Sequence, residues 1–267
     1  MIPLVFLHGT PGSGVPYEPF VQAAAGRGLR FVAYPRPGYA DAPRREGRTV
    51  ADCAADVAAL LDELGAERCH VLGWSGGGPH ALACAALLGD RVVRAEVVAG
   101  VAPWDAEGLD WKAGMGEENL EEFAAMEAGP DELRAYLDRV RPALTAITAD
   151  QVAASLGDLI GDADRRVLGG DFAEWLATSF RAAVADGVDG WLDDDMAFLR
   201  DWGFDLGAIE VPVTIWQGDE DRMVPFSHGE WLAAHVPGAR AQLLRGEGHL
   251  SIPLGRFGDI LDDLIAA

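Results

Sequence analysis

The stretch LGWSGGGPHA (residues 72–81) places one serine, Ser75, between Gly73 and three consecutive glycines. The apolar run CHVLGW ends here and an alanine-rich segment begins, which predicts a buried strand, a sharp turn and a helix. Small residues two positions before and after the serine, Gly73 and Gly77, let the turn form without a clash of backbone, and the turn then projects the hydroxyl out of the sheet. The N-terminus of the following helix presents free N–H groups that can stabilise a negative charge. The pattern favours a nucleophilic serine.

A glycine-rich loop can also bind phosphate. A P-loop requires a lysine after its glycines, and a dinucleotide-binding loop requires G-x-G-x-x-G. Residues 73–78 contain neither pattern. A tight turn with a purely structural role is the remaining alternative.

Short apolar runs alternate with helical patterns on both sides of this stretch, which predicts an α/β fold with a mostly parallel central sheet of about six strands. The expected strands are 2–7, 29–35, 69–74, 92–100, 211–218 and 239–244, and the expected helices between them are 17–27, 49–64, 76–88, 227–235 and 254–265. The first run, IPLVFL at 2–7, is short and continuously apolar, which is typical of a strand buried on both faces.

The alternation stops in the middle of the chain. From about Trp104 to Leu206 only helical segments are evident, at 117–128, 130–146, 149–159, 171–186 and 190–202. We therefore expect residues 1–103 and 207–267 to form the core and residues 104–206 a helical cap insertion. Ligands of open α/β folds bind at the carboxyl edge of the sheet, and the insertion is expected to lie over that edge.

Length and charge limit the classes of function. The 267 residues suffice for one substantial core, and the formal net charge is −22. Such a charge repels phosphate backbones and anionic membranes, so neither nucleic acid nor a membrane is an expected partner. The N-terminal apolar run is too short for a signal peptide, and the three cysteines show no C-x-x-C spacing. We expect a cytoplasmic protein with reduced thiols, without a cofactor or a metal site.

A serine hydroxyl needs a histidine to accept its proton. Of the six histidines, His249 lies in the glycine-rich loop GEGHLS after the last expected strand, at the same sheet edge as Ser75. That histidine in turn needs a carboxylate to orient it. The strand end IWQGDEDRMVP offers Asp219, Glu220 and Asp221. The resulting chain order of serine, acid and histidine fits nucleophilic catalysis at such a turn.

Acyl transfer also needs two backbone donors for the oxyanion. The N–H of Gly76, directly after the serine, is the first candidate. The loop HGTPGSG (residues 8–14) is expected to supply the second. Pro11 has no N–H, so Thr10 is preferred over Gly12.

With these residues assigned, nearly the whole chain resembles the α/β-hydrolase family. The matching segments are HGTPG at 8–12, RPGYADA at 36–42, GWSGG at 73–77, GDEDRMVP at 218–225 and GEGH at 246–249. In this family the pattern G-x-x-D-x-x-V-P places the acid third after the glycine, which implies Asp221. The resemblance also implies a cap domain after the sixth family strand, where residues 104–206 lie.

Two features depart from the family pattern. The chain starts at the strand before the His-Gly loop, without the usual N-terminal hairpin, so six strands are expected instead of eight. The strand at 29–35 would then be an apolar edge, and we expect a partner, such as a second copy in a homodimer, or the C-terminal part of the chain to cover it. The nucleophile is a serine, whereas dehalogenases and epoxide hydrolases of the family use aspartate, so neither activity is expected.

The insertion is rich in aromatic residues and methionines. Most are expected to form its own core and its contact with the sheet domain, and some to line a largely apolar substrate pocket. These residues are Trp104, Trp111, Met115, Phe123, Met126, Trp175, Phe180, Trp191, Met196 and Trp202. The acidic runs EENLEE (117–122) and DDD (193–195) are expected to be solvated faces rather than a cation site.

The expected function is hydrolysis of a small, mostly apolar carboxylic ester through an acyl-enzyme. The loop HGTPG is similar to the HGGPG loop of proline iminopeptidases, which keeps an aminopeptidase as an alternative. Perhydrolases, lactonases and C–C hydrolases share the same triad, and the sequence does not separate them. A receptor that binds a small molecule with little or no turnover is an alternative from another class, because the fold alone does not determine function.

Overall fold

The computed structural model of the chain describes residues 1–266. Six strands form one sheet in the order β2-β1-β3-β4-β5-β6, and every neighbouring pair is parallel. The strands are β1 (Ile2–Leu7), β2 (Leu29–Tyr34), β3 (Cys69–Trp74), β4 (Val92–Val98), β5 (Val213–Gly218) and β6 (Arg240–Leu244). The predicted α/β fold and its six-stranded sheet are confirmed.

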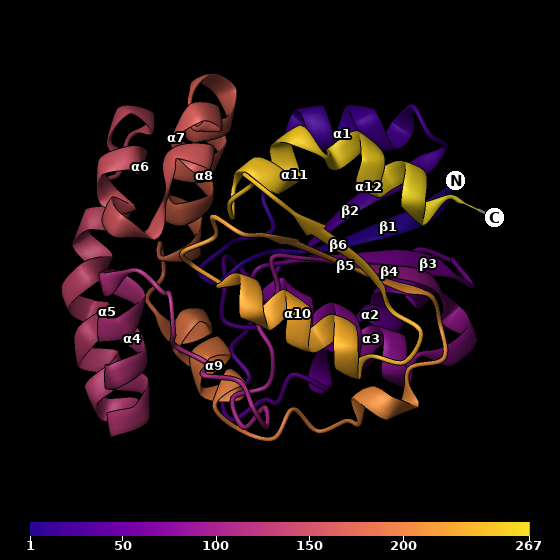
Figure 1. The fold of residues 1–267 in the computed structure, drawn as a ribbon, viewed down its shortest axis with the longest axis horizontal. Coiled ribbons are helices and arrows are strands. Elements are labelled where there is room, and N and C mark those ends of the chain that lie inside the picture. The colour runs from indigo at the N-terminus through magenta and orange to yellow at the C-terminus, as the bar shows by residue number, and fades with distance from the viewer. Residues whose placement is uncertain (267) are drawn as a thin grey trace.

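Helices cover both faces of the sheet (Figure 1), which explains why the central strands β3 and β5 are buried along their whole length. Helices α1 and α12 lie on one face, and α2, α3 and α10 lie on the other. Their bounds are α1 (Glu18–Ala25), α2 (Asp52–Glu63), α3 (Gly77–Leu87), α10 (Phe226–His235), α11 (Ser251–Gly255) and α12 (Phe257–Leu264). The single helix predicted at 254–265 is two helices, because the backbone of Arg256 leaves the helical conformation.

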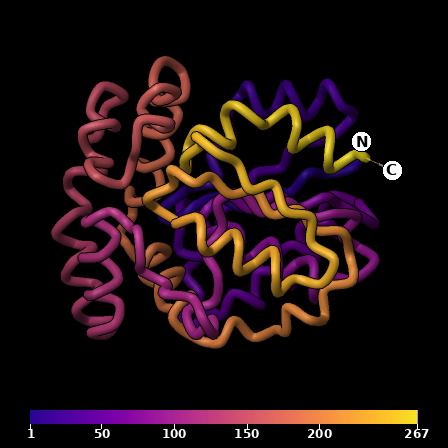
Figure 2. The backbone as a smooth tube through the Cα atoms, in the orientation of Figure 1, coloured from indigo at the N-terminus to yellow at the C-terminus, as the bar shows by residue number. Residues whose placement is uncertain are grey.

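The chain leaves the sheet after β4 and returns to it at β5, as the backbone trace in Figure 2 shows. The segment between them forms α4 (Glu117–Ala128), α5 (Pro130–Thr145), α6 (Ala149–Ser155), α7 (Asp162–Val167), α8 (Gly170–Ala183) and α9 (Asp189–Phe198). Three short 3-10 helices complete the fold at Gly89–Arg91, Gly157–Leu159 and Leu206–Ala208. The sequence analysis missed α7, because six residues are too few for a helical period to show.

Local sequence explains where several of these helices begin. Helix α5 starts at Pro130, whose fixed φ suits the first helical position, after Gly129 with a φ of 125°. Helix α6 starts after Thr148, which forms a capping box with Gln151. Helices α4 to α8 lie beyond the carboxyl ends of the strands, on the left in Figure 1.

Strand β2 is one of the two edge strands of the sheet, as expected. Helix α12 does not cover the free edge of β2, so the expectation that the C-terminal part of the chain covers this edge is wrong. The helix instead turns its apolar stripe toward the sheet and α1, where the rings of Phe257 and Phe20 stack with centroids 3.7 Å apart. Within residues 1–266 no strand pairs with the free edge of β2, and Phe31 to Tyr34 are half-buried. Cover by a partner stays a prediction.

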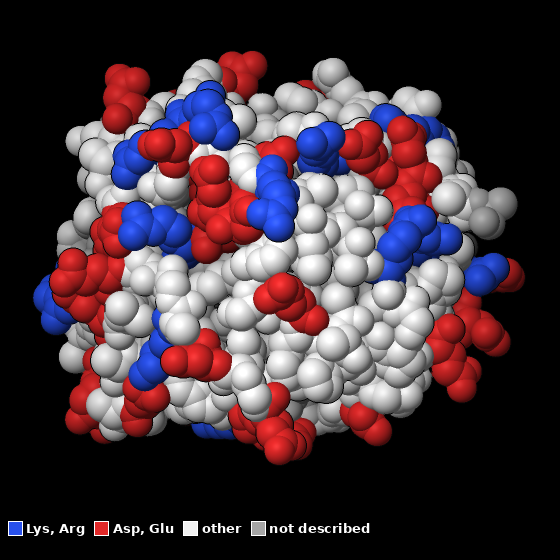
Figure 3. All heavy atoms as spheres, in the orientation of Figure 1, with Lys and Arg blue, Asp and Glu red and all other residues white. Residues whose placement is uncertain are grey.

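The surface is acidic, and Figure 3 shows aspartate and glutamate side chains spread over the visible face with arginines among them. None of the helices within residues 1–266 combines the length and the apolar character needed to cross a membrane.

Candidate active site

Ser75 lies directly after β3 with a φ of 56°, the left-handed region that non-glycine residues rarely adopt. Several residues close to it must be glycines for steric reasons. A Cβ on Gly73 would collide with the carbonyl of Gly77, and a Cβ on Gly78 would lie 2.8 Å from the Cα of Gly100. The glycines therefore permit the strained turn and the close packing of α3 on the loop after β4.

His249 and Asp221 are in contact, as the sequence predicts. The Nδ1 atom of His249 lies 2.9 Å from Oδ2 of Asp221, and both residues are buried. The backbone N–H groups of Met223 and Val224 donate to Oδ1 of Asp221 at 2.9 and 2.8 Å, and Gln217 donates to its Oδ2 at 2.9 Å. The two other carboxylates considered lie elsewhere, because Asp219 and Glu220 accept N–H groups from Gly246 and Ala163.

Electrostatics around His249 favour its protonated form. Burial lowers the pKa of His249, but the charge and hydrogen bond of Asp221 and the charge of Asp164 outweigh it, so this pKa lies above its ordinary value. Asp164, on α7, also accepts the backbone N–H groups of His249, Leu250 and Ser251 at 3.1, 2.8 and 3.0 Å. It thereby fixes the histidine loop. The sequence analysis missed this residue, since no local pattern links α7 to that loop.

Ser75 and His249 line one cavity of about 480 Å³ that also includes Thr10 and Gly76. Among residues 1–266, the Ser75 hydroxyl has no hydrogen-bond partner. Catalytic hydrogen bonds are often long before substrate binds. A Cβ on Gly76 would collide with the side chain of Thr10, so the two residues are adjacent. The backbone N–H groups of Thr10 and Gly76 are also unpaired within the described residues, which leaves both available to an oxyanion.

A buried ion cluster holds Thr10 in place. The Thr10 hydroxyl donates to Oδ2 of Asp194 at 2.7 Å and accepts from Nη2 of Arg36 at 2.9 Å. Arg36 Nε donates to Asp194 at 3.0 Å, Arg48 lies 2.7 Å from it, and the Tyr39 hydroxyl donates to it at 2.8 Å. Burial raises the pKa of Asp194, but the two arginines hold it well below its usual range. These five residues are called the Asp194 cluster below.

The expectation that residues 193–195 form a solvated face is therefore wrong. Asp193, Asp194 and Asp195 are 5%, 0% and 1% exposed. Helix α9 turns them inward, where arginines from the loop after β2 neutralise two of them. The run at 117–122 is mixed, because Glu117 and Glu121 are exposed whereas other members of the run line the cavity.

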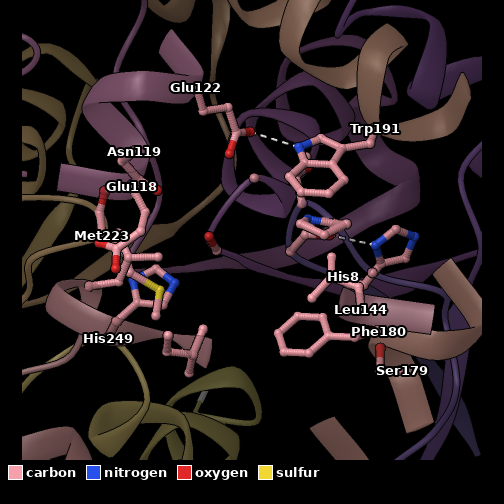
Figure 4. A pocket seen from close by; sticks show the side chains of 18 of the residues that line it. His8, Glu118, Asn119, Glu122, Leu144, Ser179, Phe180, Trp191, Met223 and His249 are labelled. Atoms are coloured by element: carbon pink, nitrogen blue, oxygen red, sulfur yellow. Dashed lines mark hydrogen bonds between the residues drawn. The ribbon is translucent and has the colours of Figure 1, made fainter. Parts of the chain in front are cut away.

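The remaining walls of the cavity are mostly aromatic and aliphatic, and Figure 4 shows them from close by. Seven aromatic residues of the inserted helices and the loop before them line the cavity, namely Trp111, Phe123, Tyr136, Trp175, Phe180, Trp191 and Phe198. Among residues 1–266, no cluster of three or more His, Cys, Asp and Glu side chains could hold a metal ion. The cavity suits an apolar molecule that reaches Ser75.

Comparison with known proteins agrees with this geometry. A family model described as alpha/beta hydrolase fold matches residues 2–255. A non-heme chloroperoxidase of Streptomyces lividans is 29% identical, over 99% of this chain and 91% of its own length. A 2-hydroxy-6-oxononadienedioate/2-hydroxy-6-oxononatrienedioate hydrolase of Cupriavidus pinatubonensis is 26% identical, over 92% of this chain and 80% of its own length.

A solved structure of a thermophilic esterase from Thermogutta terrifontis is similar in fold. It aligns with a TM-score of 0.69 over 99% of this chain and 88% of its own, at 19% identity. The residues that the family model matches, 2–255, include the strand-turn-helix around Ser75 and the loops that carry Asp221 and His249. Because this model spans nearly the whole chain, the chain belongs to the alpha/beta hydrolase fold family.

Proposed function

We propose that the chain is a serine hydrolase that cleaves small, mostly apolar carboxylic esters. The observation that carries the proposal is that Ser75, on its strained turn, shares a cavity with His249, which Asp221 orients at 2.9 Å. The aromatic walls favour an apolar acyl or alcohol group. In this proposal the helices α4 to α9 act as the cap, because they supply most of those walls.

The reaction follows from the positions of these groups. His249 Nε2 accepts the proton of the Ser75 hydroxyl while Oγ attacks the ester carbonyl, and Asp221 stabilises the imidazolium that forms. The N–H groups of Thr10 and Gly76 stabilise the oxyanion. His249 then donates its proton to the leaving alcohol, and water, activated in turn by His249, hydrolyses the acyl-enzyme.

Labelling with a fluorophosphonate probe tests the nucleophile. We expect the unsubstituted chain to be labelled and Ser75→Ala to be inert. Labelling of the variant would contradict the assignment. Hydrolysis of p-nitrophenyl acetate, compared with proline p-nitroanilide, separates an esterase from an aminopeptidase. A chain that is stabilised by small molecules but hydrolyses neither substrate would instead be a receptor.

A further inference from the structure

Two carboxyl groups lie together in the wall of the cavity. Glu122 comes from α4 and Asp195 from α9, and their carboxyl groups are close enough that each perturbs the pKa of the other. The indole N–H of Trp191 donates to Oε1 of Glu122 at 2.7 Å, as the dashed line in Figure 4 shows. Both carboxyl residues line the same cavity as Ser75. None of these contacts belongs to the proposed triad or the oxyanion donors.

Of the three consecutive aspartates of α9, two pair with arginines and the third does not. Asp193 pairs with Arg44 at 2.8 Å, and Asp194 pairs with Arg36 and Arg48. Asp195 is 1% exposed and lines the cavity, yet within residues 1–266 it has no cationic partner, and no donor reaches its Oδ2. Proteins rarely bury a carboxylate without a partner, because the loss of hydration is costly.

Within residues 1–266 no arginine or lysine forms an ion pair with either carboxyl group. Burial raises the pKa of Asp195 and of Glu122, and the charge of Glu122 raises that of Asp195 further. A cation beside the pair would lower both pKa values and stabilise the charged carboxylates. Arg139 also lines the cavity, but its guanidinium lies over the Tyr136 ring, 4.9 Å from the centroid, and its side chain is 67% exposed.

The surroundings of the pair suit a cation that comes from outside the chain. Trp191 lies beside Glu122, and Trp111 and Phe123 also line the cavity. Aromatic faces attract cations in addition to carboxylates, and more strongly where water is excluded. Glu118 lines the cavity as well and adds to its negative potential. A group with a positive charge and an apolar body would satisfy both the carboxyl pair and the walls.

We propose that Glu122 and Asp195 bind an ammonium group of the substrate while its ester lies at Ser75. The inference rests on the proposed function and specifies the substrate class, an ester with an amine on an apolar body. Binding places the N–H donors of the ammonium on the two carboxyl groups, with no covalent step. The ammonium thereby fixes which end of the substrate faces the nucleophile.

Binding to the Ser75→Ala variant tests this without hydrolysis. Benzylammonium and benzyl alcohol have nearly the same shape and differ in charge, and calorimetry measures both. We expect benzylammonium to bind more tightly by on the order of tenfold or more. Equal affinities would overturn the proposal. Fluorophosphonate labelling of the unsubstituted chain reports on the proposed function separately.

Substitutions assign the preference to the pair. Glu122→Gln and Asp195→Asn should each abolish most of the preference for benzylammonium, while benzyl alcohol still binds and shows that the variant is folded. Glu117→Gln is the matched control, because Glu117 lies on the same helix but is exposed, and the net charge changes equally. A preference that survives both substitutions, or that Glu117→Gln removes equally, would mean general attraction to an acidic protein and would refute the site.

Discussion

Replacing Asp194 by asparagine tests how the loop that carries Thr10, the proposed oxyanion donor, is held. Asp194 is fully buried and accepts hydrogen bonds from Thr10, Tyr39 and Arg36, with Arg48 at 2.7 Å. The asparagine keeps the shape, but it leaves two buried guanidinium groups without a counter-charge and turns an amide N–H₂ toward them or toward the Thr10 hydroxyl. Removing one partner of a buried ion pair costs about 3–5 kcal/mol.

A loss of this size is a large part of the total stability of a domain, which is about 5–15 kcal/mol. Urea unfolding at pH 7 measures it. Activity should fall by more than the fraction of unfolded protein accounts for, because a displaced Thr10 would no longer donate to the oxyanion. Loss of one such donor lowers kcat by about 10²–10³. Ester hydrolysis far below the urea midpoint measures this second effect on folded protein.

Asp193→Asn is the matched control. Asp193 also pairs with an arginine, but Arg44 is 28% exposed, so water can solvate it when the pair is lost. We expect a loss of about 0–1 kcal/mol and normal kcat. If Asp194→Asn were as mild as this control, the Asp194 cluster would not hold Thr10. The cluster also predicts acid sensitivity. The pKa of Asp194 is lowered on folding, so its contribution is complete above the ordinary carboxyl pKa and is lost as the pH falls below it.

Three further predictions concern single groups. The kcat/KM for an ester should rise with pH through an inflection above about 6.5, because the pKa of His249 is raised and the neutral imidazole is the base; an inflection below that value would contradict the electrostatics. Asp164→Ala should lower the free energy of unfolding by about 1–3 kcal/mol and also reduce kcat, because three backbone N–H groups of the loop that carries His249 lose their acceptor. An unchanged kcat, measured at a temperature where the variant is fully folded, would refute the connection between Asp164 and the position of His249. Burial raises the pKa of Glu96 from 4.5 to about 8 despite the hydrogen bond from Trp216. The free energy of unfolding should therefore fall as the pH rises from about 4.5 to 8. Glu96→Gln should remove most of this pH dependence, which urea titrations at several pH values measure.

The residues near Ser75 were predictable because their chemistry is local. The turn needs Gly73 and Gly77 at fixed spacing, and the acid and histidine follow strand ends within a few residues. Local chemistry therefore selects His249 and leaves Asp219, Glu220 and Asp221 as its possible partners; the resemblance to the family selects Asp221, and the structure has Asp221 and His249 in contact. What a short motif requires of the backbone can be read directly from that motif.

The residues that the sequence analysis misjudged depend on distant partners. The run at 193–195 has the composition of a solvated face, but the arginines at positions 36, 44 and 48, about 150 residues earlier, neutralise Asp193 and Asp194 and thereby permit the burial of these two residues. Asp164 likewise acquires its role from a loop some 85 residues later. Hydrophobic periodicity cannot reveal such contacts, because a carboxylate reads as polar whether water or an arginine solvates it.

Helix geometry explains how α9 serves three purposes with adjacent residues. Successive side chains of a helix point about 100° apart. Asp193 therefore faces the partly exposed Arg44, Asp194 faces Thr10, and Asp195 faces the cavity. A small rotation of α9 would therefore move the Thr10 anchor and the proposed ammonium site together. Substrate preference and oxyanion stabilisation should consequently change in parallel when the packing of α9 is altered, whereas substitutions on α4 at Glu122 should change preference alone.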